Sequence, residues 1–162
     1  MEVELKVLIE CLRKKELALK QIASITVNQG DLITSNLNHE EIYSIFMQMN
    51  TEKQQFIDRV LQCDEVFENM FRTIGPALDA DPAKYGEEVK TMQNLIRSVM
   101  DLDVQIRVNE DTNGHNLTER LVQYRDKLAL DEKGEKPETI DSGEYGSQKV
   151  LDAYRSHSRN RR

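Results

Sequence analysis

The chain has 162 residues, of which 38% are hydrophobic and 31% charged, with no Trp, seven Gly and three Pro. This length allows one domain with a modest core, and the mean hydropathy of −0.64 is typical of charged, solvent-exposed helices rather than of strands. No stretch approaches the roughly 20 apolar residues that cross a bilayer, and the net charge of −7 repels phosphate backbones, so we expect neither a membrane protein nor a nucleic-acid binder.

The first predicted helix covers residues 3–28. Its stripe recurs at spacings of three and four, with Lys15 as the polar gap. The sequence NQGD, residues 28–31, supplies a glycine stop signal. The N-terminal segment is charged throughout, unlike a signal peptide, so we expect a cytoplasmic protein. The stripe comprises Leu5, Leu8, Leu12, Leu19, Ile22 and Thr26.

The second predicted helix covers residues 38–74, with Asn38 as N-cap and Glu41 three residues later. Its stripe follows a 3.5-residue repeat for four heptads, which predicts packing as in a coiled coil. Lys53 interrupts the stripe, and we expect its stem to lie along the seam with its amine in water. The sequence GPALDADP, residues 75–82, is predicted to end the helix. The stripe comprises Phe46, Met49, Lys53, Phe56, Val60, Cys63, Phe67, Met70 and Ile74.

The third predicted helix begins with Asp81 as N-cap and Pro82 as its first helical residue, and its stripe continues to Leu128. Its middle is polar at Asp103, Glu110 and Asn113. These positions either set the alignment of the helices or open the bundle locally, or they form a polar socket for a partner helix. Because Asn113–Gly114 is a poor helical pair, costing about 1 kcal/mol, we expect a kink or fraying near residues 109–116.

The end of the third helix carries an apolar stripe that outlasts the first helix. Either the first helix or the C-terminal tail covers it, or it is an exposed groove for another protein. The stripe comprises Leu117, Leu121, Tyr124 and Leu128.

Residues 131–146 read as a flexible linker and residues 147–162 as a basic tail. The tail has five basic residues and one acidic residue, a charge of +4, so the first 146 residues carry −11 of the total of −7. Val150, Leu151 and Tyr154 share one face of a short amphipathic helix. The tail is an end without a role, an anion- or nucleic-acid-binding arm, or a helix that orders on binding a partner.

Together these elements predict an all-α fold, an elongated up-down three-helix antiparallel bundle or coiled coil over residues 1–130. The chain lacks glycine-rich phosphate loops and the motifs HExxH and ExxH. The carboxylate pairs Glu87–Glu88 and Asp101–Asp103 do not face each other on a helix. We therefore predict no catalytic, cofactor-binding or metal-binding residues. Cys11 and Cys63 lack CxxC spacing and are expected to be buried, reduced thiols, with a disulfide or a reactive thiol as the alternative.

The layout and the sequences of the predicted helices resemble those of the FlgN-like flagellar export chaperones, in particular their divergent clostridial type. The resemblance covers most of residues 1–128 and, weakly, the tail. It rests on LIECLRKKELALKQI, EKQQFIDRVLQCDEVFENMF, YGEEVKTMQNLIRSVMDLDVQIRVNE and DAYRSH. The chain departs from the family at Asn113–Gly114 and in its arginine-rich last residues.

The resemblance implies a small, acidic, cytosolic bundle without catalysis. Such proteins bind the C-terminal helices of hook–filament junction (hook-associated) proteins and deliver them to the flagellar type III export apparatus. The family binds its substrates through its C-terminal helical part, which corresponds here to Leu117, Leu121, Tyr124 and Leu128, and to Val150, Leu151 and Tyr154. Such a chaperone would be a monomer or a homodimer; the alternative is a coiled-coil scaffold or oligomerisation protein without an export role.

Overall fold

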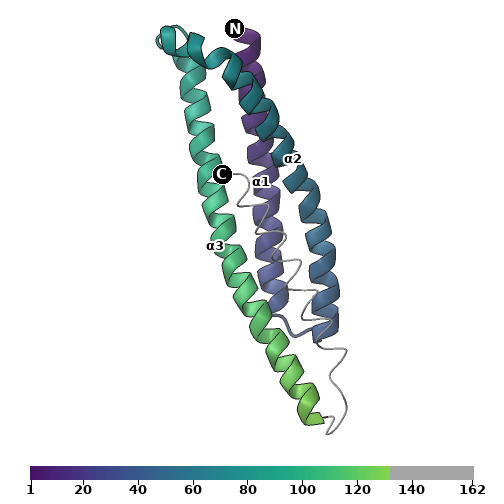
Figure 1. Cartoon of the computed structure of the whole chain (residues 1–162). Coiled ribbons are helices and arrows are strands. Elements are labelled where there is room, and N and C mark those ends of the chain that lie inside the picture. Colours follow the sequence, from purple (N-terminus) through teal and green to yellow (C-terminus); the bar gives the residue numbers. More distant parts are fainter. Residues whose placement is uncertain (132–162) are drawn as a thin grey trace. The chain divides into compact units, whose positions relative to one another are not determined.

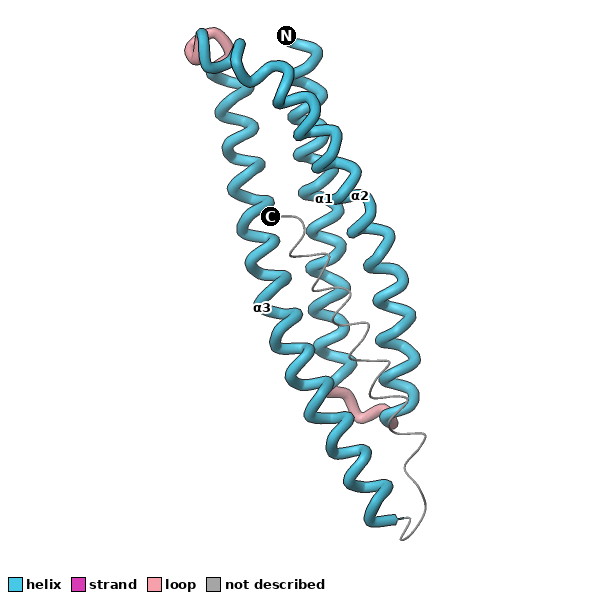
Figure 2. Tube along the Cα trace, viewed as in Figure 1, coloured by secondary structure: helices cyan, strands magenta, loops and turns pink. Residues whose placement is uncertain are grey.

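In the computed structural model, which describes residues 1–131, the chain forms three helices and, within these residues, no strand (Figure 1). They are α1 (Glu2–Ile33), α2 (His39–Ala80) and α3 (Gly86–Asp131). Short connections, residues 34–38 and 81–85, join them (Figure 2). The prediction of an all-α helical bundle is confirmed. The predicted linker and tail helix lie outside the described residues, apart from Asp131, which ends α3.

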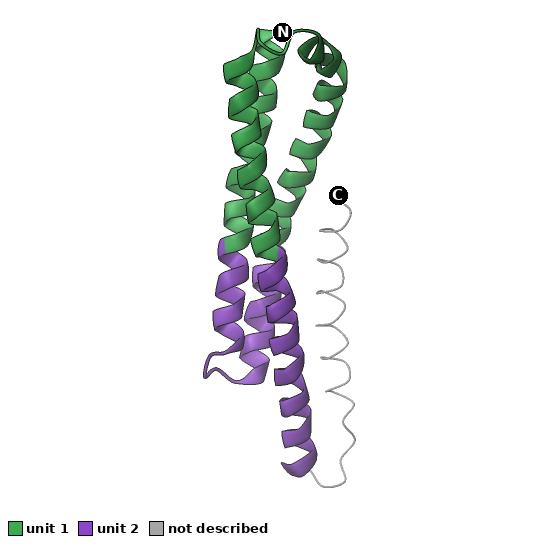
Figure 3. Ribbon diagram, turned by 90° about the vertical axis from the view of Figure 1, so that its left-hand side faces the viewer, with its two compact units in different colours: residues 1–23, 53–106 green, residues 24–52, 107–162 purple. Residues whose placement is uncertain are grey.

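The described residues divide into two compact units, each built from parts of all three helices (Figure 3). Unit 1 contains residues 1–23 and 53–106, and unit 2 contains residues 24–52 and 107–131. Within each unit, the two helices that share a short connection run in opposite directions, as expected for neighbours joined by a few residues.

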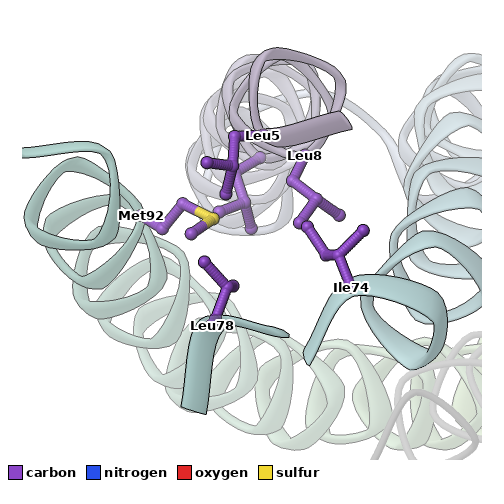
Figure 4. Packing of buried hydrophobic residues seen from close by; sticks show 6 residues of the cluster. Leu5, Leu8, Ile74, Leu78 and Met92 are labelled. Carbon is purple, nitrogen blue, oxygen red and sulfur yellow. The ribbon is translucent and has the colours of Figure 1, made fainter. Parts of the chain in front are cut away.

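The core of unit 1 is an apolar cluster to which every helix contributes (Figure 4). Leu5 and Leu8 of α1 point toward Ile74 and Leu78 of α2 and toward Met92 of α3. The leucines lie three residues apart and therefore share one face of α1. Burying each such side chain contributes about 1.5–3 kcal/mol, so this cluster holds the three helices of unit 1 together.

The core of unit 2 is smaller and is built around Ile33, Phe46 and Leu117, with Leu32 and Leu121 packed against it. Polar side chains complete it. The Gln29 amide donates a hydrogen bond of 2.8 Å to Oδ1 of Asn50. Each of the three helices thus supplies at least one core residue.

The first helix is longer than predicted because residues 28–31 do not end it. α1 continues through Gly30 to Ile33, and hydroxyl side chains that follow it hydrogen-bond to carbonyls of its last turn. Ser35 Oγ donates to the Leu32 carbonyl at 2.7 Å, and Thr34 Oγ1 lies 3.3 Å from the Gly30 carbonyl. The same two carbonyls also accept hydrogen bonds from the backbone N–H groups of Ser35 and Thr34, so the last turn of α1 is closed by both backbone and side-chain hydrogen bonds. Gly30, inside the helix, leaves room for the Asn113 side chain of α3.

The second helix begins as predicted but ends six residues later. The Asn38 side chain caps it, accepting a hydrogen bond of 2.8 Å from the Glu41 N–H. α2 then continues past Gly75 and includes Pro76. Pro76 has no N–H for the Arg72 carbonyl, but both residues are exposed, so water can bond to that carbonyl. Continuing the helix also places Leu78 in the core of unit 1.

The third helix begins later than predicted and is unbroken. Residues 82–85 form a turn, so Pro82 does not start the helix, and α3 begins at Gly86. No break occurs at Asn113–Gly114, because both residues are buried and the Asn113 side chain is hydrogen-bonded to α1. The expected kink or fraying at residues 109–116 is therefore absent.

Two predictions about single side chains need correction. Lys53 is only 1% exposed, so its amine is inside the protein, where the side chain has an interaction partner, rather than in water. Cys11 and Cys63 are free thiols, as expected, but they are half-buried.

Among residues 1–131, no helix combines the length and the apolar character that crossing a membrane requires.

Candidate functional site

The predicted stripe at the end of α3 has a buried part and a partly exposed part. Leu117 is 2% exposed and packs with Ile33 and Phe46, and Leu121 packs against the same cluster. Leu128 is half-buried, and Leu130, which the sequence analysis did not name, is 76% exposed. Leu128 and Leu130 are two residues apart and lie on different faces of α3, so the stripe itself stays partly exposed at Tyr124 and Leu128.

Arg120 attaches this part of α3 to the connection between α1 and α2. Its guanidinium donates hydrogen bonds to the carbonyls of Ile33, Ser35 and Leu37 at 2.7, 3.0 and 2.8 Å. These carbonyls lie where α1 has ended and lack helical partners. The planar fork of arginine fits several carbonyls at once, which fixes the register of α3 in unit 2.

Tyr124 and His39 form a contact next to Arg120. The Tyr124 hydroxyl donates to Oε1 of Glu40 at 3.3 Å, and its ring centroid lies 4.7 Å from that of His39. Nδ1 of His39 accepts a hydrogen bond of 3.2 Å from Nε of Arg120. Burial lowers the pKa of His39, and the positive charges of Arg120 and Lys127 lower it further. The histidine is therefore held in its neutral form as an acceptor.

Two of the three polar positions of the third stripe, Glu110 and Asn113, are partnered within unit 2. Oε1 of Glu110 accepts a hydrogen bond of 3.2 Å from the Thr26 hydroxyl, and Nδ2 of Asn113 donates to the Thr26 carbonyl at 2.7 Å. A Cβ atom on Gly30 would lie 2.8 Å from Oδ1 of Asn113. These contacts favour the interpretation that Glu110 and Asn113 align α3 with α1. Asp103 is half-buried and has a partner.

A second surface, which the sequence analysis missed, is a groove between α1 and α2 on unit 1. One part has a volume of about 700 Å³ and is lined by Val3, Val7, Cys11 and Val66, among others. The other part, of about 600 Å³, is lined by residues that include Leu17 and Phe56. Lys14, Gln62 and Cys63 line both parts, so we treat them as one α1–α2 groove.

The two thiols belong to this groove. Burial raises the pKa of Cys11 and of Cys63, and the neighbouring thiol of Cys11 raises that of Cys63 further. Because the thiolate is the reactive form, a raised pKa makes both thiols less reactive and suits them to an apolar lining. The spacing Val3–Val7–Cys11 was the available signal, since it lies beside the main stripe of α1.

The chain matches no model of a protein family, no curated protein and no solved structure. The resemblance to FlgN-like chaperones therefore stays a prediction from the layout of the helices. The other residues predicted to bind a partner, Val150, Leu151 and Tyr154, lie outside the described residues. Within residues 1–131, no group of three His, Cys, Asp or Glu side chains is arranged to hold a metal ion.

Proposed function

We propose that this protein is a cytoplasmic flagellar export chaperone of the FlgN-like type. It binds the terminal amphipathic helices of hook–filament junction proteins and delivers them to the type III export apparatus. The observation that supports this most is the end of α3, where the stripe residue Leu128 is only half-buried beyond the contacts of Arg120 and Tyr124, and Leu130, on another face of the helix, is 76% exposed.

A chaperone for such substrates needs a surface of this kind. An amphipathic helix made for a filament joint associates with its copies unless its apolar face is covered. An apolar helical face rimmed by polar residues covers it through contacts at helical spacing. The net charge of −7 helps to keep both the free chaperone and its complex in solution.

The same exposed leucines also fit the alternative of a coiled-coil scaffold that pairs with a second copy of itself. Light scattering separates the two functions. The chaperone function predicts a monomer that forms a 1:1 complex with a hook–filament junction protein. A stable homodimer whose mass does not change when that protein is added would support the scaffold and contradict the chaperone.

A further inference from the structure

The α1–α2 groove of unit 1 has the dimensions of a site for one helix. Its lining on α1 runs from Val3 to Gln21, which at 1.5 Å per residue is about 27 Å, or five helical turns. Two packed helices present a groove along their line of contact, and a further helix laid there packs against both. A helix of about 18 residues therefore matches this groove in length.

The apolar side chains along the groove are incompletely covered. Phe56 and Cys63 belong to the coiled-coil stripe of α2 but line this groove, unlike Val60 between them, which is buried. Val3, Leu17 and Val66 are 72%, 62% and 46% exposed. An exposed apolar line of this length on a helical protein marks an interaction surface.

The charges of the groove indicate what kind of helix it takes. Lys6, Lys14 and Arg59 line it, against one acidic residue, Glu10. This excess of positive charge stands out in a chain whose net charge is −7. Complementary potentials favour an acidic partner and disfavour a basic one. The chain's own tail, residues 147–162, carries +4 by sequence and is therefore a poor occupant.

We propose that the α1–α2 groove is a docking site for an amphipathic helix of another protein, one that carries acidic residues beside its apolar face. This proposal does not rest on the proposed chaperone function, since its residues lie in unit 1 and those of the α3 end lie in unit 2.

The test uses the full chain and two fluorescently labelled 18-residue helical peptides in an anisotropy titration. The peptides share one leucine face and differ only in having Glu or Lys at the positions beside it. The Glu peptide is expected to bind at least tenfold more tightly than the Lys peptide. Leu17→Glu should weaken that binding at least tenfold, because it places a charge in the groove. Met100→Glu, at a residue that is 61% exposed on α3 and outside the groove, should leave it unchanged.

A charge reversal guards against loss of binding through misfolding. The double variant Lys6→Glu, Lys14→Glu should prefer the Lys peptide, a gain that an unfolded protein cannot show. Equal binding of the two peptides, or binding that Leu17→Glu leaves intact, would overturn the proposal.

Two other occupants are outcomes of the same experiment. Displacement of the Glu peptide by an unlabelled peptide of residues 147–162 would assign the groove to the protein's own tail. A homodimer in sedimentation that Leu17→Glu dissociates would assign it to a second copy. Either result would overturn the proposal, and neither bears on binding at the α3 end, which the variant Leu128→Glu, Leu130→Glu tests separately.

Discussion

Replacing Gly30 by Ala should destabilise the protein, although alanine is the better helix former. Gly30 lies inside α1, and a Cβ atom there would be 2.8 Å from Oδ1 of Asn113, closer than Cβ atoms come to any atom in real structures. Asn113 is buried, and its Nδ2 is bonded to the Thr26 carbonyl at 2.7 Å. The Asn113 side chain therefore has to shift to make room, which strains or breaks that hydrogen bond.

The magnitude follows from two opposing terms. Ala in place of Gly in a helix contributes about 1 kcal/mol of stability. Leaving a buried amide without its hydrogen bond costs about 1–3 kcal/mol. We therefore expect Gly30→Ala to lower the free energy of unfolding by about 1 kcal/mol. In an Asn113→Ala background the contact is gone, and the same change should raise it by about 1 kcal/mol.

Urea unfolding of the wild type, both single variants and the double variant measures this coupling, for which we expect about 2 kcal/mol. Gly86→Ala at the start of α3 is the control. Its Cβ would meet nothing within 4 Å, so this change should not lower the free energy of unfolding. If Gly30→Ala is no more destabilising than Gly86→Ala, with a coupling below about 0.5 kcal/mol, then Asn113 does not set the alignment of α1 and α3.

Two other predictions test the core and the histidine contact of unit 2. Phe46→Ala, at a residue that is 1% exposed, should lower the free energy of unfolding by about 3–5 kcal/mol. Phe71→Ala, at a half-exposed residue, should lower it much less. Equal losses for the two variants in urea unfolding would show that Phe46 does not lie in the core. Because the pKa of His39 is lowered in the folded protein, its contribution to stability is complete above its ordinary value of about 6.5 and is lost as the pH falls from there toward the lowered pKa. The wild type should thus lose more stability than His39→Gln does between pH 7 and pH 5, and parallel thermal melts would contradict the proposed role of the neutral imidazole.

Helical periodicity predicted the helices and much of the core but not their ends. The α1 stripe places Leu5 and Leu8 in the core of unit 1, and the α2 stripe places Phe46 in the core of unit 2, because burial follows helical spacing. The predicted ends of the first and second helices were wrong, since α1 continues through Gly30 and α2 through Pro76. Local signals predicted a stop at both places, but tertiary contacts with Asn113 and through Leu78 decide otherwise.

The candidate sites, like the helices, were predicted only in part. The spacing of Leu117, Leu121, Tyr124 and Leu128 identified one face of α3. It did not show that Leu117 fills the core while Leu130, outside the stripe, is exposed. The groove escaped prediction because it combines residues far apart in sequence, such as Val7 and Val66, on two different helices. A stripe seen on one helix does not tell which neighbour covers it.

We propose that the end of α3 binds the terminal helix of a hook–filament junction protein, and isothermal titration calorimetry of the full chain with that helix, as a synthetic peptide, measures this binding. We expect a saturable 1:1 complex that the variant Leu128→Glu, Leu130→Glu weakens at least tenfold. Val108→Glu, at an exposed apolar residue of the same helix, should bind like the wild type. Absence of binding, or equal binding by both variants, would contradict the claim.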